Sequence, residues 1–158
     1  MHSGVLAAGE GRSIWVAGDR YTIKASGTDT AGAFALIEAL VPPGGGPPPH
    51  IHHREDEAFF LLEGELTFHV DGQNIAAAVG AWITLAKRSL HHFTNSGTTP
   101  ARMLILVSPS GLENFFLEVD REPRDGELEP IVPTPEDLEK LVSTAPKYGL
   151  EIRLPRSV

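Results

Sequence analysis

The most informative segment of this 158-residue chain reads Gly44-Gly-Gly-Pro-Pro-Pro-His50-Ile-His52-His-Arg-Glu-Asp-Glu57-Ala-Phe-Phe-Leu-Leu-Glu-Gly64. A second segment reads Gly80-Ala-Trp-Ile-Thr-Leu-Ala-Lys-Arg88-Ser-Leu-His91-His-Phe-Thr-Asn95. Together they contain five of the seven histidines. Three imidazoles and one carboxylate are enough to hold a divalent transition metal and to leave coordination positions open for chemistry. The two segments therefore predict a metal site within β-structure.

In the first segment, His50 and His52 are two residues apart, so on a strand they leave the same face, about 6.6 Å apart along the chain. His53 must then point the other way, and we expect it to face solvent. Glu57 lies five residues after His52. On a straight strand this odd spacing would put the two side chains on opposite faces, so the chain must turn between them. Spacing alone does not choose among Glu55, Asp56 and Glu57 as the carboxylate ligand.

In the second segment, alternation places His91, Phe93 and Asn95 on one face of a strand and His92 on the other. If His91 binds the metal, Phe93 forms part of the cavity wall and His92 points outward. Of the remaining histidines, His69 lies opposite an apolar face and is expected at the surface, and His2 lies near the N-terminus.

Between residues 12 and 108, short β-type runs alternate with turn signals, and no long helical pattern interrupts them. Many short, evenly spaced strands are typical of an all-β sandwich or barrel. Asp71-Gly72 predicts a hairpin turn.

The Pro- and Gly-rich run 41–49 is interpreted as a surface loop that stiffens the chain before His50. The alternative interpretation is a linker between two domains. The predicted strands are Ser13–Val16, Tyr21–Ala25, Ala33–Val41, Glu57–Leu62, Glu65–Val70, Trp82–Leu85, His91–Asn95 and Arg102–Val107.

Two helices are predicted after the last of these strands. One spans Gly111–Val119, and the other begins at an N-cap Thr134, carries Pro135 at its first helical position and ends at Ala145-Pro146. We expect this C-terminal arm to pack on the barrel and cover its mouth. The chain is predicted to be one domain with three parts: N-terminal strands (1–31) that join the barrel or a dimer interface, the barrel core (32–108) and the helical arm (109–158).

Composition excludes several classes of partner. Acidic residues outnumber basic ones by 21 to 13, for a formal charge of −8, and such a surface repels phosphate backbones, so no nucleic-acid partner is expected. No apolar run approaches the length of about 18 residues needed to span a membrane, and no signal-peptide pattern is visible. We therefore expect a cytoplasmic protein without a membrane partner. The absence of cysteine excludes disulfides and thiolate ligands.

At these residues the sequence resembles the cupin superfamily, and in particular small single-domain, quercetinase-like members of its cupin-2 group. The first cupin motif, G(X)5HXH(X)3–4E(X)6G, is met at Gly44, His50, His52, Glu57 and Gly64. The second motif, G(X)5PXG(X)2H(X)3N, is met at Gly80, His91 and Asn95. Two positions depart from it, since Ala86 replaces the proline and Arg88 replaces a glycine that sits in a turn where positive φ is often required.

The resemblance implies a double-stranded β-helix, or jelly roll, with His50, His52, Glu57 and His91 as the metal ligands. It resolves the choice among the three acids in favour of Glu57, and it implies a homodimer. The expected cofactor is one divalent transition metal (Fe, Ni, Mn, Cu, Co or Zn). The expected substrate pocket is apolar and is lined by Phe59, Phe68, Trp82, Phe93 and Met103.

The leading hypothesis is a metal-dependent dioxygenase of the quercetinase-like type that acts on an aromatic or enolic small molecule. In it, Glu57 serves both as a metal ligand and as the base that takes the substrate's proton. Two alternatives remain open: a non-oxidative metal-dependent lyase, isomerase or decarboxylase, and a small-molecule-binding protein without catalysis. One fold hosts many chemistries, so this choice rests on analogy.

Overall fold

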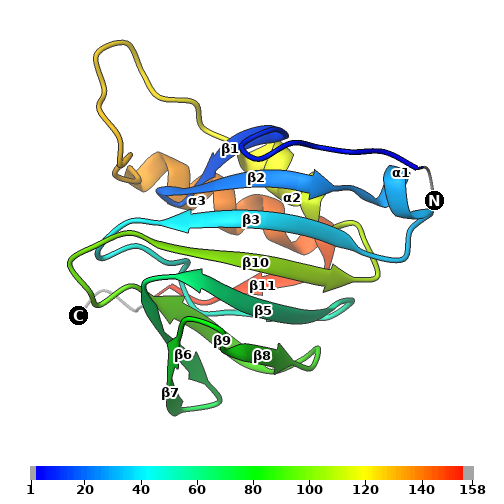
Figure 1. The fold of residues 1–158 in the computed structure, drawn as a ribbon. Coiled ribbons are helices and arrows are strands. Elements are labelled where there is room, and N and C mark those ends of the chain that lie inside the picture. The colour runs from blue at the N-terminus through cyan, green and yellow to red at the C-terminus, as the bar shows by residue number, and fades with distance from the viewer. Residues whose placement is uncertain (1–2, 155–158) are drawn as a thin grey trace.

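The computed structural model describes residues 3–154, whose strands form two antiparallel sheets packed face to face (Figure 1). The six-stranded sheet has the order β1 (Arg12–Val16), β2 (Asp19–Ala25), β3 (Ala35–Val41), β10 (Ala101–Ser108), β5 (Asp56–Glu63) and β8 (Trp82–Leu85). The five-stranded sheet has the order β11 (Leu150–Ile152), β4 (His50–His52), β9 (Leu90–Thr94), β6 (Glu65–Val70) and β7 (Gln73–Ala78). The predicted jelly roll with short C-terminal helices is confirmed.

The core lies between the inner faces of the two sheets and follows from strand alternation. In β3 and β10 every second residue is buried, so that Ile37 and Ile105 form a directly opposed buried pair. The same alternation in β6 buries Leu66 and Phe68. Because a strand turns successive side chains to opposite faces, each sheet presents one apolar face, and burying these faces against each other is the main favourable contribution to folding.

Two tight turns between neighbouring strands have positive φ at both central residues. Asp71 and Gly72, at φ 47° and 84°, form the predicted two-residue hairpin between β6 and β7. Ala17 and Gly18, at φ 50° and 90°, form an equivalent hairpin between β1 and β2. Both loops have the backbone signs of the turn that best matches the twist of paired strands.

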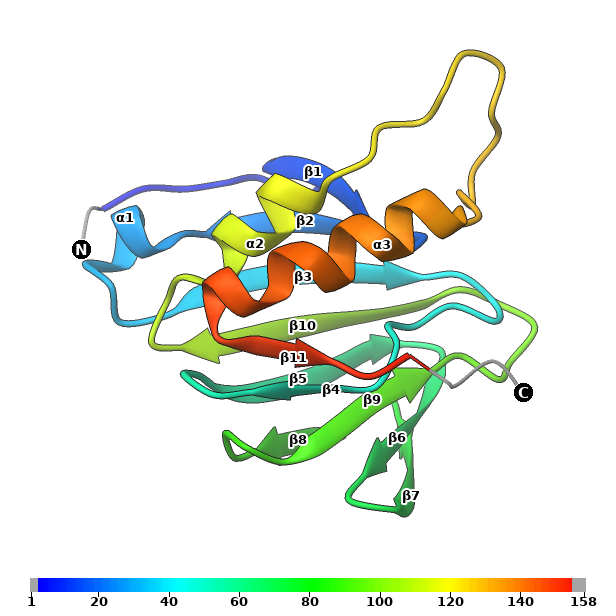
Figure 2. The ribbon, with the colours of Figure 1, turned by 180° about the vertical axis from the view of Figure 1, so that it is seen from behind.

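The chain beyond β10 returns across the molecule, as Figure 2 shows, through α2 (Leu112–Val119), α3 (Pro135–Thr144) and the 3-10 helix η1 (Ala145–Tyr148). Thr134 caps α3 as predicted, since its side chain accepts a hydrogen bond from the Asp137 backbone N–H. The arm ends in β11, which pairs with β4 so that Leu150 lies opposite His52 and Ile152 opposite His50. The C-terminal arm thereby borders the strand that carries two of the predicted ligands.

Several elements are absent from the prediction from sequence. They are the strands His50–His52, Gln73–Ala78 and Leu150–Ile152 and the short helix α1 (Gly27–Thr30). The strand β7 is largely exposed, and β11 has only three residues, so neither carries the apolar alternation on which the prediction relied. Within residues 3–154, no helix is both long and apolar enough to cross a membrane.

Candidate metal centre

The structure brings the four predicted ligand residues together at one end of the barrel interior. Pairing of β4 with β9 sets His50 directly opposite His91, and His52 follows on the same face of β4. All four side chains are buried, and one potential ligand atom from each lies within 4.8 Å of the others. The group His50, His52, Glu57 and His91 is called the His3Glu cluster below.

Glu57 reaches the cluster because the chain turns between β4 and β5. The turn is held on both sides by backbone hydrogen bonds, from His53 N–H to the Gly149 carbonyl and from Arg88 N–H to the His52 carbonyl. After it, Glu57 Oε2 lies 3.0 Å from His91 Nε2 and 3.3 Å from His52 Nε2. The turn thus brings Glu57 to the same side as His52, although their odd spacing would separate them on a straight strand.

Two of the imidazoles are oriented by backbone carbonyls. His50 Nδ1 lies 2.9 Å from the Pro48 carbonyl oxygen, and His91 Nδ1 lies 3.1 Å from that of Ser89. Because a carbonyl oxygen can only accept, these contacts favour a proton on Nδ1 in both rings, which would leave the lone pair of Nε2 available to a bound metal ion. Such outer contacts fix the tautomer and orientation of histidines that bind metals.

The cluster is electrostatically uneven. Burial and the neighbouring His91 and His52 lower the pKa of His50 to about 3. Burial also acts against a charged His52, but the carboxylates of Glu57 and Glu55 outweigh it and raise the His52 pKa to about 9. For Glu57, burial raises the pKa, and His52 and His91 more than offset it, so the pKa lies well below its usual range. One negative carboxylate is thus held among imidazoles.

The residues present fit a single divalent metal ion. Each ring nitrogen of the buried His52 lies within 3.4 Å of a carboxylate oxygen of Glu55 or Glu57, but neither completes a hydrogen bond among the described residues, so a group that engages them more closely would be favourable. Three imidazoles and a carboxylate suit the first-row transition metals and zinc, and the donor set alone does not choose among them.

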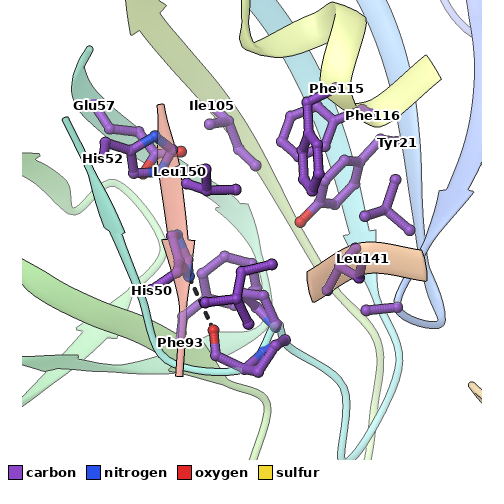
Figure 3. Close-up of a pocket in the computed structure, with 15 residues that line it drawn as sticks. Tyr21, His50, His52, Glu57, Phe93, Ile105, Phe115, Phe116, Leu141 and Leu150 are labelled. Atoms are coloured by element: carbon purple, nitrogen blue, oxygen red, sulfur yellow. Dashed lines mark hydrogen bonds and ion pairs between the residues drawn. The ribbon is translucent and has the colours of Figure 1, made fainter. Parts of the chain in front are cut away.

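A pocket of about 40 Å³ adjoins the cluster and is lined by residues of both sheets and the arm (Figure 3). His50, His52 and Glu57 lie on one side of it, and none of the described residues that line it is a lysine or arginine. Most of its wall is apolar. The lining comprises Val16, Ala17, Tyr21, Pro47, Pro48, His50, His52, Glu57, Phe93, Ile105, Phe115, Phe116, Leu141, Leu150 and Ile152.

Tyr21 supplies the pocket with a hydroxyl opposite the cluster. Its ring packs edge-on against Phe116, with ring centroids 5.0 Å apart, and its oxygen points toward the middle of the pocket (Figure 3). This hydroxyl has no hydrogen-bond partner among the described residues. Burial, reinforced by the negative charges of Asp19 and Glu57, raises the Tyr21 pKa well above its ordinary value, so the hydroxyl remains a neutral donor.

Of the five predicted pocket residues, only Phe93 lines this pocket. Phe59, Phe68 and Met103 are buried in the core beside it, where the rings of Phe59 and Phe68 pack 4.9 Å apart. The placement of Trp82 is corrected: its side chain is 59% exposed because β8 turns Ile83 and Leu85 inward and Trp82 outward. The alternation of the apolar residues Ile83 and Leu85 is the signal in the sequence that places Trp82 on the outer face.

The histidines predicted to lie outside the cluster do so wherever the structure describes them. His53 is exposed and lies 3.3 Å from Glu151. His92 and His69 are half-buried on the outer face of the five-stranded sheet, stacked on each other with ring centroids 4.3 Å apart. His2 lies outside the described residues. Arg88 occupies its turn at φ 74°, so the backbone keeps the conformation for which the motif uses glycine.

Sequence reasoning missed most of the wall because it comes from the two ends of the chain. Tyr21 lies on β2, Phe115 and Phe116 on α2, Leu141 on α3 and Leu150 on β11. The helical spacing of Leu138, Leu141 and Val142 in the sequence is the available signal for Leu141. Nothing in the local pattern places β11 beside β4.

Residues 37–107 match the Cupin_2 family, described as a cupin domain. That range contains both histidine segments and all four members of the His3Glu cluster. Residues 37–107 therefore form a cupin domain.

The chain is similar to known proteins whose names describe different activities. The chain is 25% identical over 151 residues to quercetin 2,3-dioxygenase of Bacillus subtilis, covering 96% of this chain and 44% of that protein. The fold is also similar to that of a predicted oxalate decarboxylase from Thermotoga maritima, with a TM-score of 0.57, 21% identity and coverage of 62% of this chain and 90% of that one. The polyketide cyclase RemF from Streptomyces resistomycificus gives a TM-score of 0.61 at 19% identity, covering 69% of this chain and 81% of that one.

Proposed function

We propose that this cupin is a metal-dependent dioxygenase of the quercetinase-like type that acts on an aromatic or enolic small molecule. The proposal rests on the position of the His3Glu cluster, which lies on the wall of a mainly apolar pocket. None of the described residues that line this pocket is a lysine or arginine. Such a wall favours an uncharged, apolar substrate over a phosphorylated or polycarboxylate one, because a buried anion needs a compensating cation. The distant likeness to a quercetin 2,3-dioxygenase supports the same class.

The residues of this chain bind and orient the substrate. The His3Glu cluster would hold the metal ion, which when bound supplies Lewis acidity and open positions for an enolate oxygen and for O2. Phe93, Phe115 and Phe116 offer ring faces and edges to an aromatic body and exclude water from it. The Tyr21 hydroxyl donates a hydrogen bond to a second oxygen of the substrate and thereby fixes its orientation.

In this proposal Glu57 is the base that removes the enol proton. It is the only carboxylate among the described lining residues, and its Oε2 is already in contact with His52 and His91. A proton taken by Glu57 would stay in the buried site and remain available for the product. In the overall reaction, O2 is the oxidant, both of its atoms enter the products, and carbon–carbon bonds of the substrate break: one in a β-diketone, and two in a flavonol, which releases carbon monoxide.

The size of the pocket favours a compact substrate. Its volume of about 40 Å³ is far below the roughly 300–1,000 Å³ of sites that enclose drug-sized ligands. A β-diketone is therefore expected to turn over more readily than a flavonol, which needs displacement of the arm residues Leu141 and Leu150.

The proposal is tested by measuring O2 consumption by the protein loaded in turn with Fe(II), Ni(II), Mn(II), Co(II) and Cu(II). The substrates are a panel of flavonols and β-diketones, and His91→Ala is the control that lacks a ligand. Oxygen uptake that is equimolar with substrate loss and absent from the control supports the proposal. Turnover that proceeds equally without O2 identifies a non-oxidative lyase, isomerase or decarboxylase instead. No turnover with any of the metals refutes the proposed activity on these substrate classes.

A further inference from the structure

The acidic run Glu55-Asp56-Glu57 places three neighbouring carboxylates in three different surroundings. Glu57 belongs to the His3Glu cluster. Asp56 is exposed, and its Oδ1 accepts a hydrogen bond of 2.9 Å from the Lys87 backbone N–H. Glu55 is only 4% exposed although it lies outside the cluster. A buried carboxylate is costly unless a partner compensates its charge, so the surroundings of Glu55 call for a function.

Glu55 faces the outer nitrogen of a cluster histidine. Its Oε2 lies 3.4 Å from His52 Nδ1, while the other ring nitrogen of His52 lies 3.3 Å from Glu57 Oε2. The same Glu55 oxygen has no hydrogen-bond partner among the described residues. His52 therefore lies between an inner carboxylate, which belongs to the cluster, and an outer one, which does not.

This outer contact distinguishes His52 from the other two histidines. The Nδ1 atoms of His50 and His91 face the neutral backbone carbonyls of Pro48 and Ser89. A carboxylate attracts the Nδ1 proton more strongly than a carbonyl does, and it thereby makes Nε2 a stronger electron donor. When a metal ion withdraws charge from the ring, the same contact strengthens and compensates the buried charge of Glu55.

We propose that Glu55 is a positioning residue that orients His52 and raises its donor strength toward the metal, making His52 the strongest imidazole ligand of the cluster. The inference rests on the metal centre alone and not on the proposed reaction, because it concerns the affinity and ligand field of the bound ion.

The test compares metal binding by the full-length wild-type chain and three variants. Glu55→Gln keeps the size and an acceptor oxygen but removes the charge, and Glu55→Asp keeps the charge but withdraws it from His52. Asp56→Asn is the matched control. It removes the same charge from the neighbouring residue, which is exposed. Metal-free protein is titrated with Co(II) in competition with a chelator, without substrate, and the visible absorption of the bound Co(II) is recorded.

Both Glu55 variants are expected to bind Co(II) about 10- to 100-fold more weakly than the wild type, as is common when an outer contact of a ligand is removed. Their Co(II) bands should shift, whereas those of Asp56→Asn should not, and its affinity should stay within about twofold. Wild-type-like affinity and spectra in both Glu55 variants would overturn the proposal. So would an equal loss in Asp56→Asn, which would indicate a general effect of charge. If Glu55→Gln does not fold, as judged by circular dichroism, Glu55→Asp decides. Because no substrate is present, failure of the dioxygenase proposal leaves this result unaffected.

Discussion

Replacing Asp19 with asparagine should stabilise this protein progressively as the pH rises. Asp19 is fully buried where β2 begins, and its Oδ1 accepts a hydrogen bond of 3.2 Å from the Gly46 backbone N–H. Its Oδ2 has no partner among the described residues. Burial, only partly offset by the hydrogen bond from Gly46, raises the Asp19 pKa from 3.8 to about 8.

The sign follows from proton linkage. Between about pH 4 and pH 8, the folded protein keeps the Asp19 proton that the unfolded chain has lost, so this group lowers the free energy of unfolding as the pH rises. The loss amounts to about 1.4 kcal/mol per pH unit inside that window. In the Asp19→Asn variant, the amide oxygen would accept the Gly46 hydrogen bond without ionising. The stability advantage of the variant over the wild type should therefore grow by about 3 kcal/mol between pH 5 and pH 7.

The assay is urea unfolding followed by circular dichroism at pH 5, 6 and 7, with chelator present for both proteins. Titration of the His3Glu cluster affects both proteins alike and cancels in the difference between them. A difference in unfolding free energy that stays constant across these pH values would refute the reasoning, because it would mean that Asp19 ionises at its ordinary pKa in the folded state.

The remaining predictions concern the site and one turn. His50→Ala and His91→Ala should reduce metal content from near-stoichiometric to trace amounts with an unchanged circular dichroism spectrum, whereas His53→Ala should retain the metal. Elemental analysis measures the metal content, and metal loss in His53→Ala would contradict the assignment of strand faces. Tyr21→Phe should raise KM about 10-fold, the equivalent of one hydrogen bond, with unchanged metal content; an unaltered KM would show that the hydroxyl does not contact the substrate. Arg88→Gly should raise the free energy of unfolding by roughly 0.5–1 kcal/mol, because Arg88 holds φ 74°; urea unfolding that shows a loss would contradict this account.

Local sequence patterns were sufficient to predict which way the histidines face. The spacing of His50 and His52 placed both on one face of a strand, and the alternation around His91 separated it from His92, because side-chain direction in a strand depends only on parity. The cap at Thr134 was equally local, since it needs only a hydroxyl and the first turn of a helix. Each of these inferences involves residues within a few positions of one another.

The choice among Glu55, Asp56 and Glu57 lay beyond parity. It depends on how the chain turns after His52, and that turn is fixed by hydrogen bonds to Arg88 and Gly149, which are distant in sequence. The cupin resemblance selected Glu57 by analogy, and the structure supplies the physical reason. It also gives Glu55 a place that the sequence does not indicate, behind the ring of His52.

The sequence by itself, read with the cupin resemblance, determined the double-sheet architecture, the facing of the histidines and the identity of the four residues that meet. Only the tertiary structure decided what surrounds them. Phe59, Phe68 and Met103 point inward as expected but fill the core beside the pocket, and the wall is completed instead by Tyr21 from β2 and Leu150 from β11. Alternation specifies on which side of a strand a residue lies. Which distant segments close over that side depends on packing between the two ends of the chain, which no local pattern encodes.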